Sequence, residues 1–196
     1  MRALLTNDTQ TVLFVLITLA WWLEFLIFPS PKGHDNSKSR SEHQSFRRIM
    51  AAILGSIALS IMTVWSGFGL WPELWRSQLR TFSVAVYGIG LLFRYGSLIS
   101  LGKHFSRNVE VGADQELISS GFYRFLRHPL YLGLFLLAAA VPLFMGSALG
   151  FAAAVLWVGK MLNQRMQLEE AMMEEVIGSR YQEWKAKRFR FIPFIF

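Results

Sequence analysis

The sequence predicts an all-α, polytopic membrane protein with five transmembrane helices. Two observations carry this prediction: apolar residues gather in long runs, and basic residues gather between those runs. Of the 196 residues, 53% are hydrophobic and 17% are charged, whereas a soluble domain usually carries about 25% charged residues. A spanning helix needs about 20 mostly apolar residues, and several of the runs approach or exceed this length.

The first three predicted spans are single apolar runs. They occupy residues 11–28, 49–71 and 81–102. A polar loop, residues 29–48, separates the first span from the second, and residues 72–80 form a short connection to the third. The first run lacks the small-residue cleavage motif of a removable signal peptide, so we expect it to stay as a helix.

The last two predicted spans form a helical hairpin. The fourth, residues 130–145, is short for a membrane helix, and small residues at 146–147 leave room for a tight turn. The fifth helix begins at Ala148, leaves the apolar zone near Leu162 and continues as a charged helix up to Gly178. Glycine is common directly after a helix because it adopts the left-handed conformation without a steric penalty.

Lys and Arg in short loops mark the cytoplasmic side of a membrane protein. Here they accumulate after the first, third and fifth spans, whereas the opposite side holds only Arg2, Arg76 and Arg80. The N-terminus is therefore expected outside and the C-terminus in the cytoplasm. This topology brings the polar segments 102–129 and 163–196 to the same cytoplasmic face.

Composition excludes several classes of site and partner. Cysteine is absent, so disulfides, thiolate metal sites and cysteine nucleophiles are excluded. The four histidines show no metal-ligand spacing, and no metal site is expected. The net charge of +7 lies in short loops between apolar runs, which indicates contact with membrane lipids rather than nucleic acid. The absence of targeting extensions favours a prokaryotic inner (plasma) membrane.

The stretch GFYRFLRHPLYLG places basic side chains directly before the fourth span. Pro129 suits the first turn of a helix because it lacks an amide hydrogen. His128 is then held beside the unsatisfied N–H groups of the helix start, where Arg124 and Arg127 add positive potential for an anionic group. The alternative is that these three side chains only contact lipid head groups.

The stretch RMQLEEAMMEEVIGSRYQEW follows on the charged part of the fifth helix. Arg165 and Glu169 are four residues apart and can meet on one helical face, so that at least one of Glu169 and its neighbour Glu170 points away from the pair. The alternative is a solvated, salt-bridged helix that leaves the membrane. Together with the basic helix start, these carboxylates suit a zwitterionic, partly aromatic ligand.

These motifs in this order resemble the isoprenylcysteine carboxyl methyltransferases, integral membrane enzymes that use S-adenosylmethionine. The resemblance rests on LGKHFS, ELISSGFYRFLRHPLYLG, R-x-x-x-E-E with a later G-x-x-Y, and the basic, proline-containing tail FRFIPFIF. Ile177 stands where the family usually has phenylalanine. The resemblance covers residues 94–196, the expected catalytic core of a single membrane domain (1–196), and the N-terminal helices in 1–93 match by hydropathy only.

The resemblance implies a cofactor pocket for S-adenosyl-L-methionine on the cytoplasmic side. The implied cofactor-binding residues are Leu117, Ile118, Gly121, Tyr123, His128, Pro129, Tyr131 and Glu170. Arg165 would lie nearer the reacting centre, with Glu169 orienting it, and both are the implied catalytic residues. The acceptor would be an oxygen, most simply the carboxylate, of a lipophilic small-molecule or prenylated substrate.

A carboxylate acceptor needs no general base from the protein, because it is already deprotonated at neutral pH. Arg165 can hold it by a charge-assisted hydrogen bond. A hydroxyl acceptor would instead need a base, for which His104 and His128 are the candidates. Arg94, inside the third span, faces either a partner in a cavity or the interface, and Glu24 is expected at the interface.

Three other functions fit parts of the sequence. Methylation of a lipid amine or thiol needs the same cofactor. Membrane sterol reductases carry a similar RHPxY-type motif and bind a nicotinamide dinucleotide, although they are much longer and the Glu169–Glu170 pair favours the methyltransferases. A small helical scaffold or permease would bind no nucleotide-like ligand at all.

Overall fold

The computed structural model describes residues 9–28, 39–102 and 117–192, and these form an all-helical bundle. The helices are α1 (Thr9–Ile27), α2 (Ser39–Ser66), α3 (Glu73–Leu101), η3 (Gly121–Arg124), α4 (Pro129–Phe144), α5 (Ala148–Ala153), η4 (Ala154–Val158), α6 (Gly159–Ile177) and α7 (Ser179–Ala186). In the described ranges the β-pairing is limited to two isolated bridges, Leu70 with Ser147 and Leu126 with Phe189. The prediction of an all-α fold is confirmed.

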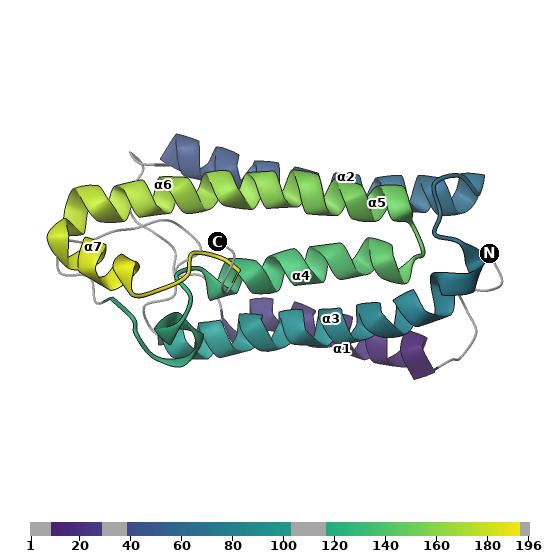
Figure 1. Ribbon diagram of the computed structural model, residues 1–196, viewed down its shortest axis with the longest axis horizontal. Helices are drawn as coiled ribbons and strands as arrows, with labels where there is room; N and C mark the ends of the chain where they lie inside the picture. Colours follow the sequence, from purple (N-terminus) through teal and green to yellow (C-terminus); the bar gives the residue numbers. More distant parts are fainter. Residues whose placement is uncertain (1–8, 29–38, 103–116, 193–196) are drawn as a thin grey trace.

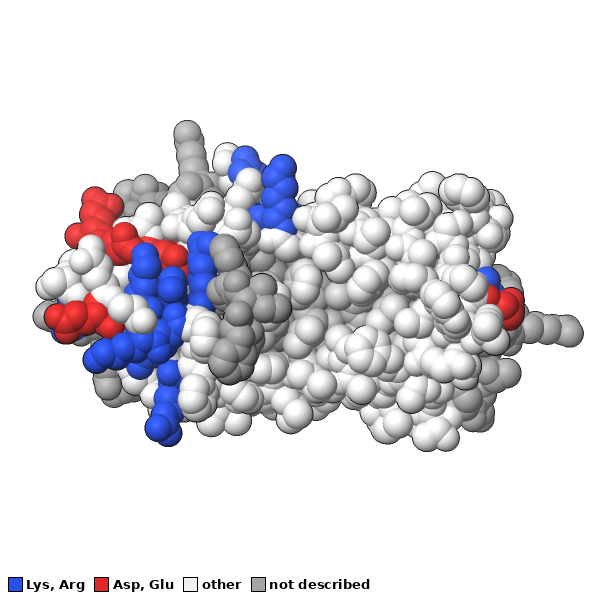
Figure 2. Space-filling model, viewed as in Figure 1, with Lys and Arg blue, Asp and Glu red and all other residues white. Residues whose placement is uncertain are grey.

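The long helices run nearly parallel to one another along the length of the molecule (Figure 1). The segments α5, η4 and α6 follow one another as one long rod, with α2 behind it, α4 in the middle layer and α3 with α1 on the far side. At one end, α7 folds back beneath α6 and lies near the start of α4. We call this the charged end, because most Lys, Arg, Asp and Glu side chains gather there (Figure 2).

Three helices are long and apolar enough to cross a membrane: Thr9–Ile27, Gln44–Ser66 and Glu73–Leu101. The apolar helix Pro129–Phe144 is shorter. Large apolar side chains face outward from these helices, among them Trp65, which is 90% exposed, and Leu26, which is 77% exposed. Burying so much apolar surface requires a lipid environment, and the protein is therefore an integral membrane protein.

Three predicted helix boundaries were wrong. α2 begins at Ser39, inside the predicted polar loop 29–48. α2 ends at Ser66 rather than at residue 71, because Gly67 and Gly69 take positive φ angles of 75° and 71° and turn the chain. The predicted connection 72–80 is instead helical, since α3 begins directly after Pro72. By contrast, Gly178 ends α6 with a φ of 67°, as its sequence position predicted.

α3 and α4 pack closely because glycines face each other where they cross. A Cβ added at Gly90 would lie 3.0 Å from the carbonyl oxygen of Gly133, closer than ordinary side-chain contacts allow. Small residues at helix contacts let backbones approach in the membrane. This contact fixes the first two turns of α4 against α3. These turns directly follow His128 and contain Tyr131, two residues of the site described next.

Candidate active site

The chain enters α4 through a short extended pairing with the C-terminal segment. The backbone N–H of Arg127 donates to the carbonyl of Phe189 at 2.9 Å, and the N–H of His128 donates to the carbonyl of Arg190 at 3.3 Å. His128 caps α4 and Pro129 is its first residue, as predicted. The segment after α7 is thereby held against the start of α4, and it contributes its own side chains to the site.

Glu170 is the centre of a cluster of basic groups. Its carboxylate lies 3.1 Å from Nη1 of Arg127, 3.1 Å from Nε2 of His128 and 3.2 Å from Nε of Arg190. Glu170 is only 8% exposed. Burial alone would raise the pKa of this carboxyl, but the hydrogen bond and charge of His128, with the charges of Arg190 and Arg127, outweigh burial and lower the pKa to about 2. Glu170 is therefore a buried, fully ionised carboxylate at neutral pH.

Glu169 belongs to a second group of contacts one residue earlier on α6. Nε of Arg165 donates to the Glu169 carboxylate at 3.0 Å and to the hydroxyl of Tyr131 at 3.3 Å. The Tyr131 hydroxyl in turn donates to Glu169. The predicted i, i+4 pair of Arg165 and Glu169 is thus formed, and Arg165 is 4% exposed.

His128 joins the two groups. Its Nδ1 lies 3.8 Å from Glu169, its Nε2 contacts Glu170, and its ring stacks on that of Tyr131 with centroids 5.8 Å apart. The carboxylates of Glu169 and Glu170 therefore lie next to different ring nitrogens of His128. The result is a compact set of cations, anions and aromatic rings at the charged end of the bundle.

A tryptophan and an arginine of the α7 region clamp the segment before η3. Nε1 of Trp184 lies 3.2 Å from the carbonyl of Ile118 and 3.0 Å from Oγ of Ser119. Arg188 donates to the carbonyl of Tyr123 at 2.7 Å and to Ser119 at 2.9 Å. An open pocket of about 560 Å³ adjoins this clamp and is lined by Leu117, Ser119, Arg180, Glu183, Trp184, Lys187 and Arg188.

Gly121 and two buried tyrosines shape the interior beside this clamp. Gly121 has a φ of 54°, and a Cβ there would lie 2.2 Å from Oγ of Ser100, so only glycine fits without displacing α3. Tyr123 and Tyr181 are 8% and 3% exposed. Burial raises the pKa of both phenols, and they stay neutral.

An apolar cavity of about 120 Å³ lies on the other side of Tyr131 and Arg165. Its walls come from α1, α2, α3, α4 and α6, and its lining residues are Trp21, Phe25, Phe46, Ile49, Met50, Arg94, Leu130, Tyr131, Leu134 and Arg165. Among the described residues of this lining, the two arginines are the only charged ones, and the rest are mostly apolar. Tyr131 and Arg165 belong both to this cavity and to the charged cluster, so the two spaces share a wall.

The prediction that Glu24 lies at the membrane interface was wrong. Glu24 is fully buried and accepts two hydrogen bonds from Arg94, one of them from Nε at 2.7 Å. A carboxylate and a guanidinium satisfy each other's charge, which makes burial of both tolerable. The sequence left open whether Arg94 faces a partner in a cavity or the membrane interface, and the structure supports the partner in a cavity.

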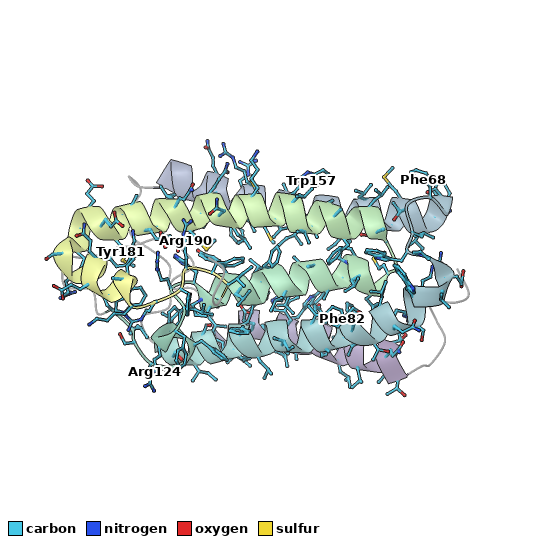
Figure 3. The ribbon with its side chains drawn as sticks, in the orientation of Figure 1. Phe68, Phe82, Arg124, Trp157, Tyr181 and Arg190 are labelled. Carbon is cyan, nitrogen blue, oxygen red and sulfur yellow. The ribbon has the colours of Figure 1, made fainter. Side chains whose placement is uncertain are left out.

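The structure brings most predicted site residues together. His128, Tyr131, Arg165, Glu169 and Glu170 contact one another directly, while Leu117, Ile118, Gly121, Tyr123 and Pro129 lie in the adjoining segment and first helical turn. Arg124 is exposed and points away from the bundle, whereas Arg190 reaches inward towards α6 (Figure 3). His104 lies outside the described residues.

Sequence reasoning missed three contributors: Arg190, Trp184 and Arg188. All three lie in or after α7. Trp184 and Arg188 contact residues more than 60 positions earlier, and the Arg190 side chain contacts Glu170, 20 positions earlier. A signal existed in the basic tail FRFIPFIF, which includes Arg190. Nothing in local spacing, however, shows which of several basic residues folds back onto the site.

Comparisons with known proteins point to one family. Residues 83–175 match the profile of the isoprenylcysteine carboxyl methyltransferase (ICMT) family. The protein-S-isoprenylcysteine O-methyltransferase of Schizosaccharomyces pombe is 27% identical over 121 residues, which are 61% of this chain and 51% of that protein. The enzyme of the same name from Saccharomyces cerevisiae is 30% identical over 135 residues, 64% of this chain and 56% of that protein. The chain thus spans about half the length of these two relatives.

The fold is also similar to a solved structure. It is that of a eukaryotic intramembrane Ras methyltransferase, an isoprenylcysteine carboxyl methyltransferase, with a TM-score of 0.67. The match covers 97% of this chain and 70% of the other, at 18% sequence identity. At this identity the likeness concerns the fold, and it extends over almost all of the helices described above.

Proposed function

We propose, from the match of residues 83–175 to the isoprenylcysteine carboxyl methyltransferase family, that the protein methylates the carboxylate of a lipophilic acceptor of the isoprenylcysteine type. The methyl donor is S-adenosyl-L-methionine. The observation that carries the proposal is the shared wall of the two spaces: Tyr131 and Arg165 line the apolar cavity and also contact Glu169 of the charged cluster. A lipid and a charged nucleoside can therefore meet at one point.

The charged cluster has the donor set that such a cofactor needs. Glu170 offers an ionised, buried carboxylate for the cofactor's hydroxyl or ammonium groups, and the rings of His128 and Tyr131 offer aromatic surface. The segment Leu117, Ile118, Gly121 and Tyr123 would complete the pocket, held in place by Trp184. When bound, the sulfonium cofactor supplies an activated methyl group.

Arg165 is proposed to hold the acceptor carboxylate, and Glu169 with Tyr131 fixes the guanidinium in position. The carboxylate is the attacking group and is ionised at neutral pH, so none of these residues has to remove a proton. The protein's task is to align donor and acceptor and to exclude water from the ionised oxygen. The apolar cavity receives the part of the lipid that adjoins the carboxylate.

The proposal includes a topology. α1, α2, α3, α4 and the α5–α6 rod would form five spans, with the charged end in the cytoplasm. The support is the unequal distribution of basic residues. The charged end carries most of them (Figure 2), whereas Arg76 and Arg80 lie in the first turns of α3. The cofactor would then enter from the cytoplasm and the acceptor from the bilayer, as their solubilities require.

A labelling experiment tests this function. Purified protein in lipid nanodiscs is incubated with S-adenosylmethionine carrying a tritiated methyl group and with an S-prenylated cysteine that has a free carboxylate. The expected product releases its label as methanol in base, because it is a methyl ester. The same acceptor supplied as its methyl ester is the matched control and should take up no label.

Three outcomes would contradict the proposal. Base-stable label would indicate a methylated amine or thiol. Co-purification of a nicotinamide dinucleotide, with no binding of S-adenosylhomocysteine, would indicate a reductase. Absence of any nucleotide-like ligand would leave the membrane scaffold as the function.

A further inference from the structure

A groove between α2 and α6 lies outside both spaces of the candidate site. It has a volume of about 280 Å³ and is lined by Gln44, Ser45, Arg48, Met161, Gln164 and Leu168. We call it the α2–α6 groove. Phe46, Ile49 and Met50, from the same stretch of α2, line the apolar cavity instead. This stretch therefore separates the groove from the cavity, and the proposed function makes no use of the groove.

The two walls of the groove come from helices that lie along each other (Figure 1). Gln44 and Arg48 are one turn apart on α2 and face Gln164, on α6, across the groove. Farther from the charged end the helices touch, since a Cβ at Gly55 would lie 3.6 Å from the ring of Trp157. Gly55 lies seven residues, about 10 Å, along α2 from Arg48. The groove thus passes from a polar part into an apolar contact.

The surface beyond the polar part faces the lipid. Leu54 is 63% exposed, Leu156 is 67% exposed and Trp157 is 49% exposed. The apolar stretch of α2 that can cross a membrane begins at Gln44, so the polar lining belongs to the first turns of that stretch. The groove therefore lies where the lipid head groups meet the hydrocarbon, and its apolar end continues along the acyl-chain region.

Two cations flank the groove, one from each helix. Arg48 is exposed on α2, and Lys160 is exposed on α6, one turn from Gln164 and on the same helical face. In the described ranges the ion pairs are made by other cations, and neither of these two side chains has a carboxylate partner. A charge at the edge of the hydrocarbon is unfavourable unless an opposite charge neutralises it. The groove therefore favours an anion.

We propose that the α2–α6 groove binds one anionic phospholipid. Its phosphate would lie between Arg48 and Lys160, and the amides of Gln44 and Gln164 would donate hydrogen bonds to the head group. One acyl chain would lie along Trp157. Basic pockets between membrane helices are suited to anionic head groups. A zwitterionic lipid brings its own cation to this site, and free phosphate leaves the apolar end empty, so neither complements the groove as well.

Native mass spectrometry of the purified protein in a neutral detergent tests this site. The added lipids are dioleoylphosphatidylglycerol and dioleoylphosphatidylcholine, which share their acyl chains and differ in net charge. A salt concentration of about 150 mM screens general attraction to the charged surface. The proteins are the wild type, Arg48→Gln, Lys160→Gln and the control Arg47→Gln. The control removes the same charge from an exposed neighbour on α2 that does not line the groove.

The wild type should bind one phosphatidylglycerol about 30-fold more tightly than phosphatidylcholine, about 2 kcal/mol. Arg48→Gln and Lys160→Gln should each reduce this preference about fivefold, because each removes one cation near the phosphate. Arg47→Gln should change it by less than about twofold. Gln164→Trp, at an exposed position, fills the groove while both cations stay, and it should abolish the saturable binding of phosphatidylglycerol. This fourth variant tests the site even if a charge variant does not fold.

Four results would overturn the proposal. They are equal affinities of the wild type for the two lipids, a preference that survives in both Arg48→Gln and Lys160→Gln, an equal loss in Arg47→Gln, and unchanged binding in Gln164→Trp. Displacement of phosphatidylglycerol by an equal concentration of inorganic phosphate would also overturn it, because the site would then bind the anion without the lipid. The proposal does not depend on the methyl-transfer reaction.

Discussion

His128 and Glu170, 42 positions apart in the chain, meet at 3.1 Å where α4 begins and α6 passes it. This contact joins the start of one helix to the charged part of another, and two arginines share the same carboxylate. The protein's own basic side chains thus hold this buried anion in place, which would give the proposed cofactor pocket a fixed carboxylate.

Glu170→Gln should weaken binding of S-adenosylhomocysteine about 100-fold, about 2.8 kcal/mol. The amide keeps the shape of the side chain but removes the charge that holds Arg127, His128 and Arg190 together. Isothermal titration calorimetry in detergent measures the affinity. Glu175→Gln, the same change at an exposed position of α6, is the control and should bind normally. His128→Ala should lose affinity as well, and normal affinity in both Glu170→Gln and His128→Ala would contradict the assignment of the cofactor pocket.

The stability that Glu170 contributes to the folded protein should decrease as the solution is acidified. Its pKa is about 2 in the folded protein against an ordinary value of 4.5. A carboxyl with a lowered folded pKa adds stability above its unfolded pKa and loses it as the pH falls towards the folded value. The difference in unfolding temperature between the wild type and Glu170→Gln should therefore be constant from pH 8 to about 5.5 and shrink between pH 4.5 and 2. A difference that grows on acidification would be inconsistent with this ionised carboxylate.

Tyr131→Phe should lower kcat about tenfold, about 1.4 kcal/mol, while the affinity for S-adenosylhomocysteine changes little. The hydroxyl accepts from Arg165 and donates to Glu169, so its loss loosens the guanidinium that holds the acceptor carboxylate. The aromatic ring beside His128 is retained. Steady-state methylation assays at saturating cofactor measure the effect. A change confined to cofactor affinity would place the Tyr131 hydroxyl in the cofactor pocket instead.

Gly133→Ala should destabilise the protein by about 2 kcal/mol, as overpacking of a close contact does. The new Cβ would lie 2.7 Å from Arg94 and 2.8 Å from the carbonyl oxygen of Gly90, which forces α3 and α4 apart. Gly88→Ala, on α3 where it faces α1, is the control: its nearest neighbour would be Ile17 at 3.9 Å. Since alanine is a better helix former than glycine, the control should be neutral or slightly stabilising. Thermal unfolding in detergent compares the two.

The long helices and the two charged motifs could be predicted from the sequence because their signals are local. Apolar runs give the spans, Pro129 gives the start of α4, and the spacing of Arg165 and Glu169 gives their pairing. The start of α3 at Glu73 was missed because its first two turns carry polar residues, and hydropathy cannot distinguish a polar helical turn from a loop.

Contacts between distant segments could not be predicted in the same way. Glu24 looked like an interfacial residue because its hydropathy is that of any carboxylate near a helix end, and only the fold places Arg94 opposite it. Arg190 is one of several basic residues in the tail, and its position depends on the turn at Gly178 and on the backbone pairing with Arg127 and His128. Long-range partners of charged residues follow from topology rather than from spacing.

The reversal of the chain at Gly178 has a consequence for biogenesis. Ribosomes deliver the polypeptide from its N-terminus, so every long helix is inserted before α7 and the segment with Arg190 can fold back onto α4. A partly synthesised chain would hold Glu170 without Arg190, one of its three basic partners, and the segment before η3 without the contact of Trp184. If the proposed function holds, binding of the methyl donor would therefore require that this last segment has been synthesised.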